Sequence, residues 1–304
     1  MAEMIRPAFF AACTLAASPA WALDIVTVTE GVWALVGETE QRSPENLGNN
    51  ATFGVIVTPD GVVLTDPGGS WKGAEAIHAA IRTLTDLPVR YVIDTGGQDH
   101  RWLGNGYWRA QGATIIASAA ALADQRDRVD MQMVGLHLLI GDAVAGTEPT
   151  YADTVFDDAM TLDFGGLSIE IIHPGPAHTP GDSYVWIAAK DTVFAGDIVY
   201  LDRMLGVGEQ SSILEWPAAF EALAAHAPAH IVPGHGGPGD LAQATAQTYD
   251  YLVNLRARIG ALIEAGGDLA QAAGVDQSAF SGLAQFDSLA GKNAEAAFVQ
   301  MEFE

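Results

Sequence analysis

The sequence of 304 residues contains a single cysteine, Cys13. A disulfide within the chain and a zinc site built on several thiolates are therefore both excluded. Basic residues are also scarce, because 14 Lys and Arg stand against 38 Asp and Glu, which gives a formal net charge of −24. A surface of this sign repels phosphate groups, so we expect neither nucleic acid nor an anionic membrane surface as a partner.

Long apolar runs are missing too. The one run that stands out, residues 7–17, follows a basic residue and is too short to span a bilayer as a helix. Residues 20–22 read Ala-Trp-Ala, which fits the small-x-small rule for signal cleavage. We expect residues 1–22 to be a signal peptide removed before Leu23, which places the protein in the periplasm or outside the cell, free of the membrane. A lipoprotein site at Cys13 is the alternative, but the apolar run before it is short.

The order of expected elements favours one α/β domain. Period-two and apolar runs predict strands at 24–29, 31–37, 51–57, 62–65, 89–94, 113–117, 154–162, 167–173, 183–188, 192–195 and 230–232. Helical periodicity predicts helices at 71–85, 118–134, 213–225 and 240–264, and two short helical pieces after 266. This order suggests two packed sheets with helices outside them. We expect a single domain over 23–304, with a helical C-terminal extension over 266–304.

Four loops that follow short apolar strands present Asp or His side chains. They contain Asp99-His100, His178 within Pro174–Asp182, Gly196-Asp197, and Gly234-His235-Gly236. Each loop alone is most simply a polar turn. Together, histidines and carboxylates at strand ends, with glycines beside them, are typical of a preorganised divalent-metal site.

These motifs resemble those of the metallo-β-lactamase-fold hydrolases. The resemblance runs from about Asp24 to Glu264 and rests on Thr65-Asp66-Pro67-Gly68, the loop Ala177–Asp182, Gly196-Asp197 and Pro233–Gly236. It implies a four-layer αββα sandwich with metal ions at the sheet edges between its two halves. Within the family, the chain is most similar to periplasmic metallohydrolases associated with sulfur-oxidation and quinoprotein systems.

The resemblance also implies roles for individual residues. Asp99, His100, Asp197 and His235 match the second metal site, with Asp197 in the position that bridges two ions. His178 matches the third ligand of the first site. Asp66 matches a buried carboxylate that supports the metal site from behind its ligands.

The segment before Asp99 departs from the family pattern. The family has Thr-His-x-His-x-Asp-His, whereas this chain has Gly96, Gly97 and Gln98 between Thr95 and Asp99. Both histidines of the first site are missing, so one zinc ion is expected rather than two, with iron or manganese as alternative metals. We expect the two glycines to leave open the space that the two imidazoles would fill.

A mononuclear site changes the expected mechanism. Asp99 and His178 are the candidate catalytic residues, because His178, freed from ligation, could act as general base or hydrogen-bond the substrate. Gln98 could orient the attacking water. The sequence thus predicts a secreted hydrolase of an acyl, ester, lactone or lactam bond in a small molecule. Two alternatives are a catalytically inactive binding protein and an iron-dependent oxidoreductase like the persulfide dioxygenases. The persulfide dioxygenases keep the histidine pair, so its absence here counts against the second alternative. Nothing in the sequence indicates an oligomeric state.

Overall fold

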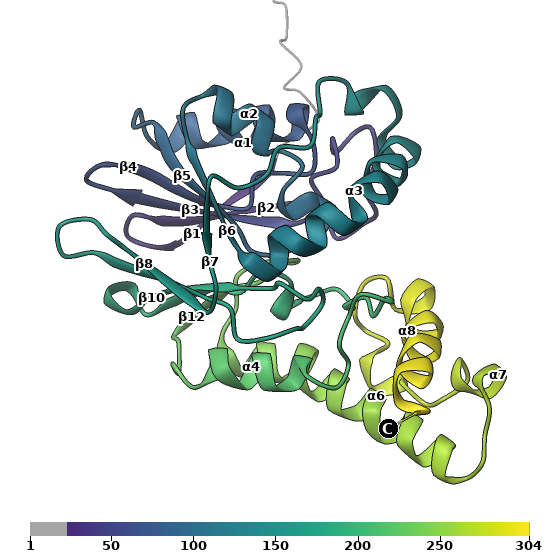
Figure 1. The fold of residues 1–304 in the computed structure, drawn as a ribbon. Coiled ribbons are helices and arrows are strands. Elements are labelled where there is room, and N and C mark those ends of the chain that lie inside the picture. The colour runs from purple at the N-terminus through teal and green to yellow at the C-terminus, as the bar shows by residue number, and fades with distance from the viewer. Residues whose placement is uncertain (1–22, 304) are drawn as a thin grey trace, which may run out of the picture.

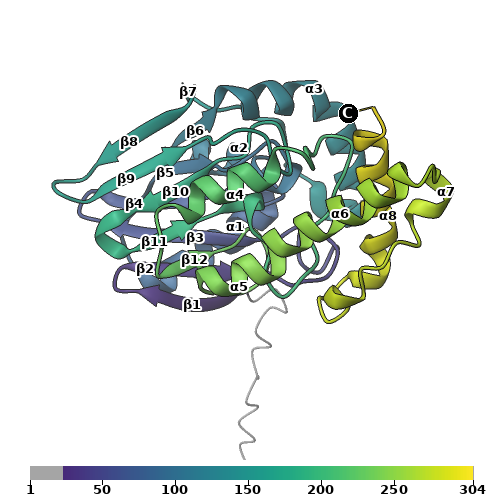
Figure 2. The ribbon, with the colours of Figure 1, turned by 90° about the horizontal axis from the view of Figure 1, so that it is seen from below.

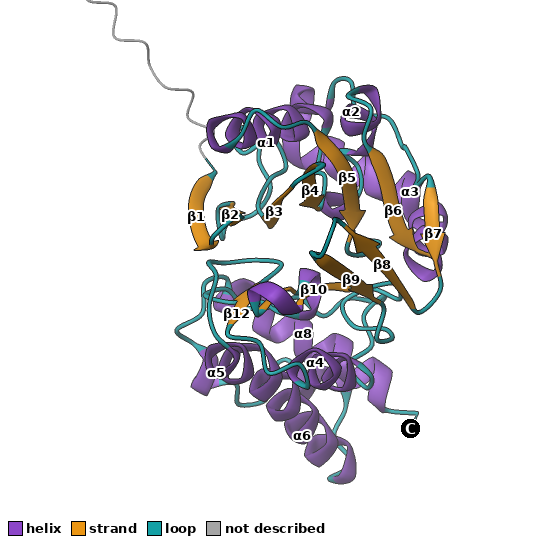
Figure 3. Ribbon diagram, turned by 90° about the vertical axis from the view of Figure 1, so that its left-hand side faces the viewer, coloured by secondary structure: helices purple, strands orange, loops and turns teal. Residues whose placement is uncertain are grey.

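Two β-sheets lie face to face, with helices on both outer sides (Figure 1). The computed structural model describes residues 23–303, so the expected signal peptide lies outside the described residues. The two sheets and the helical layers confirm the expected four-layer αββα sandwich. Figure 3 shows the layers edge on, with the two sheets between the helices.

The first sheet has seven strands in sequence order. Its first four strands are antiparallel and its last four parallel, with β4 shared between the two groups. The predicted hairpin at Pro59-Asp60-Gly61 is confirmed, because Thr58 pairs with Gly61 at its closed end. The strands are β1 (Asp24–Thr29), β2 (Val32–Val36), β3 (Thr52–Thr58), β4 (Gly61–Thr65), β5 (Val89–Asp94), β6 (Thr114–Ser118) and β7 (Thr154–Phe156).

The second sheet has five strands in the order β12-β11-β10-β9-β8. Strands β8 to β11 are antiparallel, and β12 runs parallel to β11. The expected strand at 154–162 is in fact two strands, β7 and β8, which belong to different sheets. The strands are β8 (Ala159–Asp163), β9 (Ser168–Ile172), β10 (Tyr184–Ile187), β11 (Thr192–Phe194) and β12 (His230–Val232).

The facing sides of the two sheets form a central apolar core. Its first-sheet members include Ile56 and Ile93, and its second-sheet members include Ile171 and Phe194, all buried. Burying an isoleucine or phenylalanine side chain of this kind contributes about 1.5–3 kcal/mol to folding. This core fixes the two sheets relative to one another, and therefore fixes the loops at their common edge.

Helices cover the outer faces. Helices α1 (Trp71–Leu84) and α2 (Asn105–Ala110) pack against the first sheet through residues such as Ile77 and Trp108. Helices α4 (Trp216–Ala224), α6 (Asp250–Glu264) and α8 (Phe286–Met301) share one apolar cluster with the second sheet, and Figure 2 shows α4 in front of that sheet, with α6 beside α8. None of the described helices combines the length and the apolar character needed to cross a membrane.

Three helical predictions differ from the structure. Helix α3 (Ala119–Ile140) continues past Gly135 because Leu136 and Ile140 are buried against the Trp102 region. The single helix expected at 240–264 is divided into α5 (Leu241–Ala244), a π-helical turn and α6. In the tail, α7 (Leu269–Ala272) is short, but α8 is 16 residues long.

Candidate metal centre

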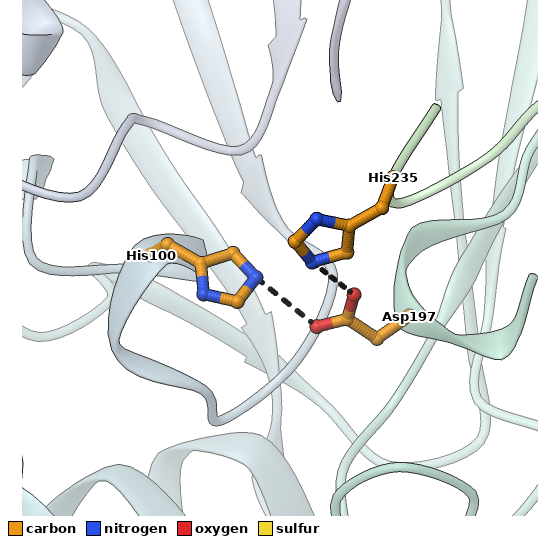
Figure 4. A group of neighbouring side chains, drawn as sticks. All are labelled: His100, Asp197 and His235. Atoms are coloured by element: carbon orange, nitrogen blue, oxygen red, sulfur yellow. Dashed lines mark ion pairs between the residues drawn. The ribbon is translucent and has the colours of Figure 1, made fainter. Parts of the chain in front are cut away.

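The site residues come from loops at one common edge of the two sheets. His100 follows β5 of the first sheet, whereas Asp197 follows β11 and His235 follows β12 of the second. Because β11 and β12 are parallel neighbours, their carboxyl ends bring Asp197 and His235 side by side. One ligand atom from each of these three buried residues lies within 4.8 Å of the others, and Figure 4 shows the arrangement.

Three histidine rings are oriented by the acceptor at their Nδ1 atoms. Nδ1 of His235 lies 2.8 Å from the Asn50 carbonyl, and Nδ1 of His178 lies 3.0 Å from the Gly206 carbonyl. Nδ1 of His100 lies 3.3 Å from Oδ1 of Asp99. A carbonyl or carboxylate oxygen only accepts, so the neutral tautomer with its proton on Nδ1 satisfies each of these contacts and leaves a lone pair on Nε2 for a metal ion.

Two of these lone pairs face the same carboxylate. Nε2 of His100 lies 3.3 Å from Oδ2 of Asp197, and Nε2 of His235 lies 3.4 Å from Oδ1. Nε2 of His100 is buried without a hydrogen-bond partner among the described residues. Lone pairs that converge without an intervening proton suit a cation, and two imidazoles with a carboxylate form a set that zinc, iron or manganese accepts. The residues present therefore fit one divalent ion.

Burial keeps two of the imidazoles neutral. It lowers the pKa of His235 well below its ordinary value, although Asp197 opposes the shift. It also lowers the pKa of His178, again against the influence of Asp197. Neutral imidazole is the form that binds a metal ion or accepts a proton.

The fully buried Arg101 forms an ion pair with the Asp197 carboxylate. Burial opposes ionisation of Asp197, but Arg101 and then His100 outweigh it and hold its pKa well below the ordinary value. Arg101 also donates from Nη1 to Oδ2 of Asp66 over 2.7 Å. The pKa of Asp66 is raised by burial, and Arg101 offsets only part of that effect. Arg101 thus links the two carboxylates beneath the candidate metal centre.

Asp99 is not part of the three-residue group. Its Oδ2 pairs with Nη1 of Arg42, which comes from the loop between β2 and β3. Burial alone would raise the pKa of Asp99, but Arg42 and His100 hold it below the ordinary value. Its Oδ1 accepts from the His100 backbone N–H over 2.9 Å. The Asp99 carboxylate thus orients His100 and is itself covered by Arg42.

The expected open space at the two glycines is absent, so that prediction is wrong. A Cβ at Gly97 would overlap the Asp124 carboxylate of α3, and one at Gly96 would overlap Asp182. Side chains of α3 also bind the backbone here, since Gln132 donates to the Gly97 carbonyl over 2.8 Å. The first-site side of the cleft is therefore filled by helix α3 and by the loop before β10.

A cavity of about 140 Å³ opens beside the three histidines. Its walls combine the residues expected at the site with several that the sequence motifs did not indicate. The lining residues are Gln41, Arg42, Asn50, Gln98, His100, His178, Tyr200, Arg203, Gly206, His235 and Leu289. His178 and Gln98 thus face the same cavity as the candidate metal centre, although His178 lies outside the three-residue group.

Gln98 is fixed between two charged groups. Its amide nitrogen donates to Oδ1 of Asp99 over 3.2 Å, and its oxygen accepts from Nη1 of Arg128 over 3.3 Å. Arg128 in turn pairs with Asp124 through Nε, at 2.7 Å. A polar network anchored on α3 therefore occupies the region next to His178.

Sequence reasoning missed the arginines and the contribution of the C-terminal extension. Arg101 follows Asp99-His100 directly, and basic residues are rare in this chain, which was the one available signal. In α8, the side chain of Asn293 accepts from the Val207 N–H and donates to the Leu205 carbonyl. This contact holds the loop whose Gly206 carbonyl orients His178. No local sequence pattern indicates such a long-range contact.

Comparisons with known proteins agree with the αββα fold. In structure, the chain is similar to a metallo-beta-lactamase from Pontibacter korlensis, with 21% identity, a TM-score of 0.62, and coverage of 76% of this chain and 99% of the other. It is also similar to DIM-1 metallo-beta-lactamase, with 20% identity, a TM-score of 0.59, and coverage of 76% and 97%. The family model described as "Metallo-beta-lactamase superfamily" matches residues 48–235, from the loop before β3 to the third residue of the candidate metal centre. The chain therefore belongs to the metallo-beta-lactamase superfamily.

Proposed function

We propose that this protein is a metal-dependent hydrolase that cleaves an acyl, ester, lactone or lactam bond in a small molecule. The observation that carries the proposal is the convergence of His100 and His235 on Asp197, with both Nε2 atoms turned toward its carboxylate. These three residues would hold one ion, for which zinc is the first candidate. Zinc at this position would supply Lewis acidity, which polarises a carbonyl oxygen and acidifies water.

The other residues of the cavity would act on the substrate and the water. His178 is neutral and presents its unprotonated Nε2, so it can accept a proton from water or a hydrogen bond from the substrate. Asp99 keeps His100 in the required tautomer. Gln98, held by Arg128, is placed to orient a polar group in the cavity.

The cellular location belongs to the same proposal. A cleaved signal peptide over residues 1–22 would deliver the protein to the periplasm or the exterior, where it would meet its substrate without binding nucleic acid or membrane. N-terminal sequencing of protein expressed with its natural leader tests this part, with Leu23 as the expected first residue.

A second function, ligand binding without catalysis, is favoured by one observation. Arg42 pairs with Asp99 and Arg101 pairs with Asp197, so guanidinium groups already neutralise carboxylates that would face a metal ion. Such a site is electrostatically stable with no ion bound. The choice between the two functions depends on whether an ion binds tightly.

Metal analysis together with an activity assay decides between them. The protein is purified without added metal, its metal content is measured, and hydrolysis of chromogenic ester, lactone and lactam substrates is followed with and without zinc. We expect about one ion per chain and turnover that chelation abolishes. Two tightly bound ions would contradict the mononuclear site, and no turnover with any metal would favour the binding protein.

His178 provides a finer test of the mechanism. Replacement His178→Ala should leave the metal content unchanged, because His178 is outside the three-residue group, while kcat falls by about 10²–10⁴-fold, the usual contribution of a general base. Loss of the ion in this variant would instead make His178 a ligand.

A further inference from the structure

The charge of the cavity differs from the charge of the whole protein. The chain carries 38 acidic and 14 basic residues. Yet two arginines, Arg42 and Arg203, are among the residues that line the cavity, and no aspartate or glutamate is. The cavity wall is therefore cationic within a strongly acidic protein.

Arg203 has no carboxylate partner. Ion pairs within 4.0 Å are formed by six arginines of the described chain, and Arg203 is not one of them. Its Nε is buried with no hydrogen-bond partner, as is the Nε of Arg42. Its Nη1 lies 3.2 Å from Nδ1 of His235, an atom that also lies 2.8 Å from the Asn50 carbonyl, so this contact supplies no negative charge to Arg203. A guanidinium that is partly buried and unpaired costs free energy unless an anion meets it.

The backbone of Arg203 is fixed in this position. Its strand-like segment forms a bridge to Ala284 of the C-terminal extension, with Met204 N–H donating to the Ala284 carbonyl over 2.9 Å. Two carboxylates act on Arg203 through their charge, Asp197 and then Glu40, and Glu40 accepts a hydrogen bond from Gln285 over 2.6 Å. The fold therefore keeps Arg203 at the cavity, while the Glu40 carboxylate is bound to Gln285.

The charges around the cavity balance only without a metal ion. The carboxylates of Asp66, Asp99 and Asp197 pair with only two guanidinium groups, those of Arg42 and Arg101, and Arg203 adds the third positive charge without an ion pair of its own. A divalent ion at His100 and His235 would add two positive charges to this balanced set. A negatively charged substrate group beside the Arg203 guanidinium would offset part of the positive charge that the ion adds.

We propose that the substrate carries a carboxylate group, which Arg203 binds through its guanidinium while Arg42 flanks it. This inference rests on the proposed hydrolase function. One unpaired guanidinium matches a single negative charge, and its planar fork fits the two oxygens of a carboxylate. The acidic protein around the cavity disfavours a doubly charged phosphate.

Calorimetric titration of the purified protein, with its metal content measured, tests the inference. The probes are N-acetylglycine, its uncharged counterpart N-acetylglycinamide, and inorganic phosphate. We expect N-acetylglycine to bind at least about tenfold more tightly than the amide, because a charge-assisted hydrogen bond is lost in the amide. In Arg203→Gln this preference should fall below about twofold, with the metal content unchanged.

Two further variants make the test specific. Arg90→Gln removes the same charge from an exposed position on β5 and should keep the tenfold preference. Arg203→Lys keeps the charge without the planar fork, so it should retain part of the preference if Arg203→Gln fails to fold. Equal binding of N-acetylglycine and its amide, an unchanged preference in Arg203→Gln, or tighter binding of phosphate would each overturn the inference.

The outcome is separable from that of the proposed function. Zinc-dependent turnover of neutral esters without any carboxylate preference would leave the hydrolase standing and refute the role of Arg203. A carboxylate preference that depends on Arg203, in a protein without turnover, would support the carboxylate site and refute the hydrolase.

Discussion

Arg101 donates to both carboxylate oxygens of Asp197, from Nε to Oδ2 at 3.0 Å and from Nη2 to Oδ1 at 2.6 Å. The same carboxylate faces the two histidines of the candidate metal centre on its other side. Asp197 is therefore shared between a permanent cation of the protein and the candidate position of a metal ion. The arginine fixes the carboxylate in the geometry that the histidines require.

Removing Arg101 should strongly destabilise the fold. In Arg101→Met, two buried carboxylates lose their shared cation, which typically costs about 3–5 kcal/mol. The free energy of unfolding, measured by urea denaturation, should fall by that amount. Arg258→Met is the control, because the Arg258–Asp276 pair is solvent-exposed and its loss should change the free energy of unfolding far less. Similar losses in the two variants would contradict the role assigned to Arg101.

Metal binding should depend on His235 and not on histidine content in general. His235→Ala removes one of three converging ligands, so we expect the bound metal to fall from about one ion to well under half an ion per chain after dialysis. His137→Ala is the matched control, since His137 is exposed on α3. Elemental analysis of the two proteins measures the difference. Full metal content in His235→Ala would place the ion elsewhere.

The two glycines before Gln98 should not tolerate side chains. In Gly97→Ala the new methyl group meets the Asp124 carboxylate, so the free energy of unfolding should fall by about 1–3 kcal/mol, as in overpacked cores. Gly135→Ala lies within α3 with open space around its Cβ position. This control should gain about 0.5–1 kcal/mol from helix propensity. Thermal unfolding of both variants measures the difference. A loss of stability in Gly97→Ala alone shows that the space beside Gly97 is filled, and equal stability in both variants would show that it is open.

Asp94 should make stability depend on pH. Burial raises its pKa well above the ordinary value of 3.8, despite a hydrogen bond from Asn105, so this carboxyl stays protonated to a higher pH in the folded protein than in the unfolded chain. Its contribution to stability is fully present below the unfolded pKa and is lost as the pH rises toward the folded pKa. Asp94→Asn removes this dependence. The unfolding free energy of the variant minus that of the original protein should therefore increase as the pH rises above about 4. A difference independent of pH would show that Asp94 titrates normally.

Much of the fold could be predicted from local sequence. Alternating strands such as β3, and turn residues such as Asp60-Gly61, carry their own signals, because side-chain period and turn geometry are local properties. The boundaries of α3 could not be predicted, since burial of Leu136 and Ile140 outweighs the propensity cost of Gly135. The π-helical turn before α6 was also unpredictable. It lies where Thr248 binds both backbone groups of Tyr200, which is distant in sequence.

The sequence alone predicted the family and a ligand set in which His100, Asp197 and His235 stood together with Asp99, with His178 matching the first site, because the glycine-flanked loops at strand ends are local motifs. It also showed that the histidine pair of the first site is absent. Only the tertiary structure decided what replaces that pair. Packing of α3 against Gly96 and Gly97 fills the space, and Arg101, Arg42 and Arg203 reach the site from separate segments. Buried charges acquire their partners from the folded chain, and no local pattern encodes those partners.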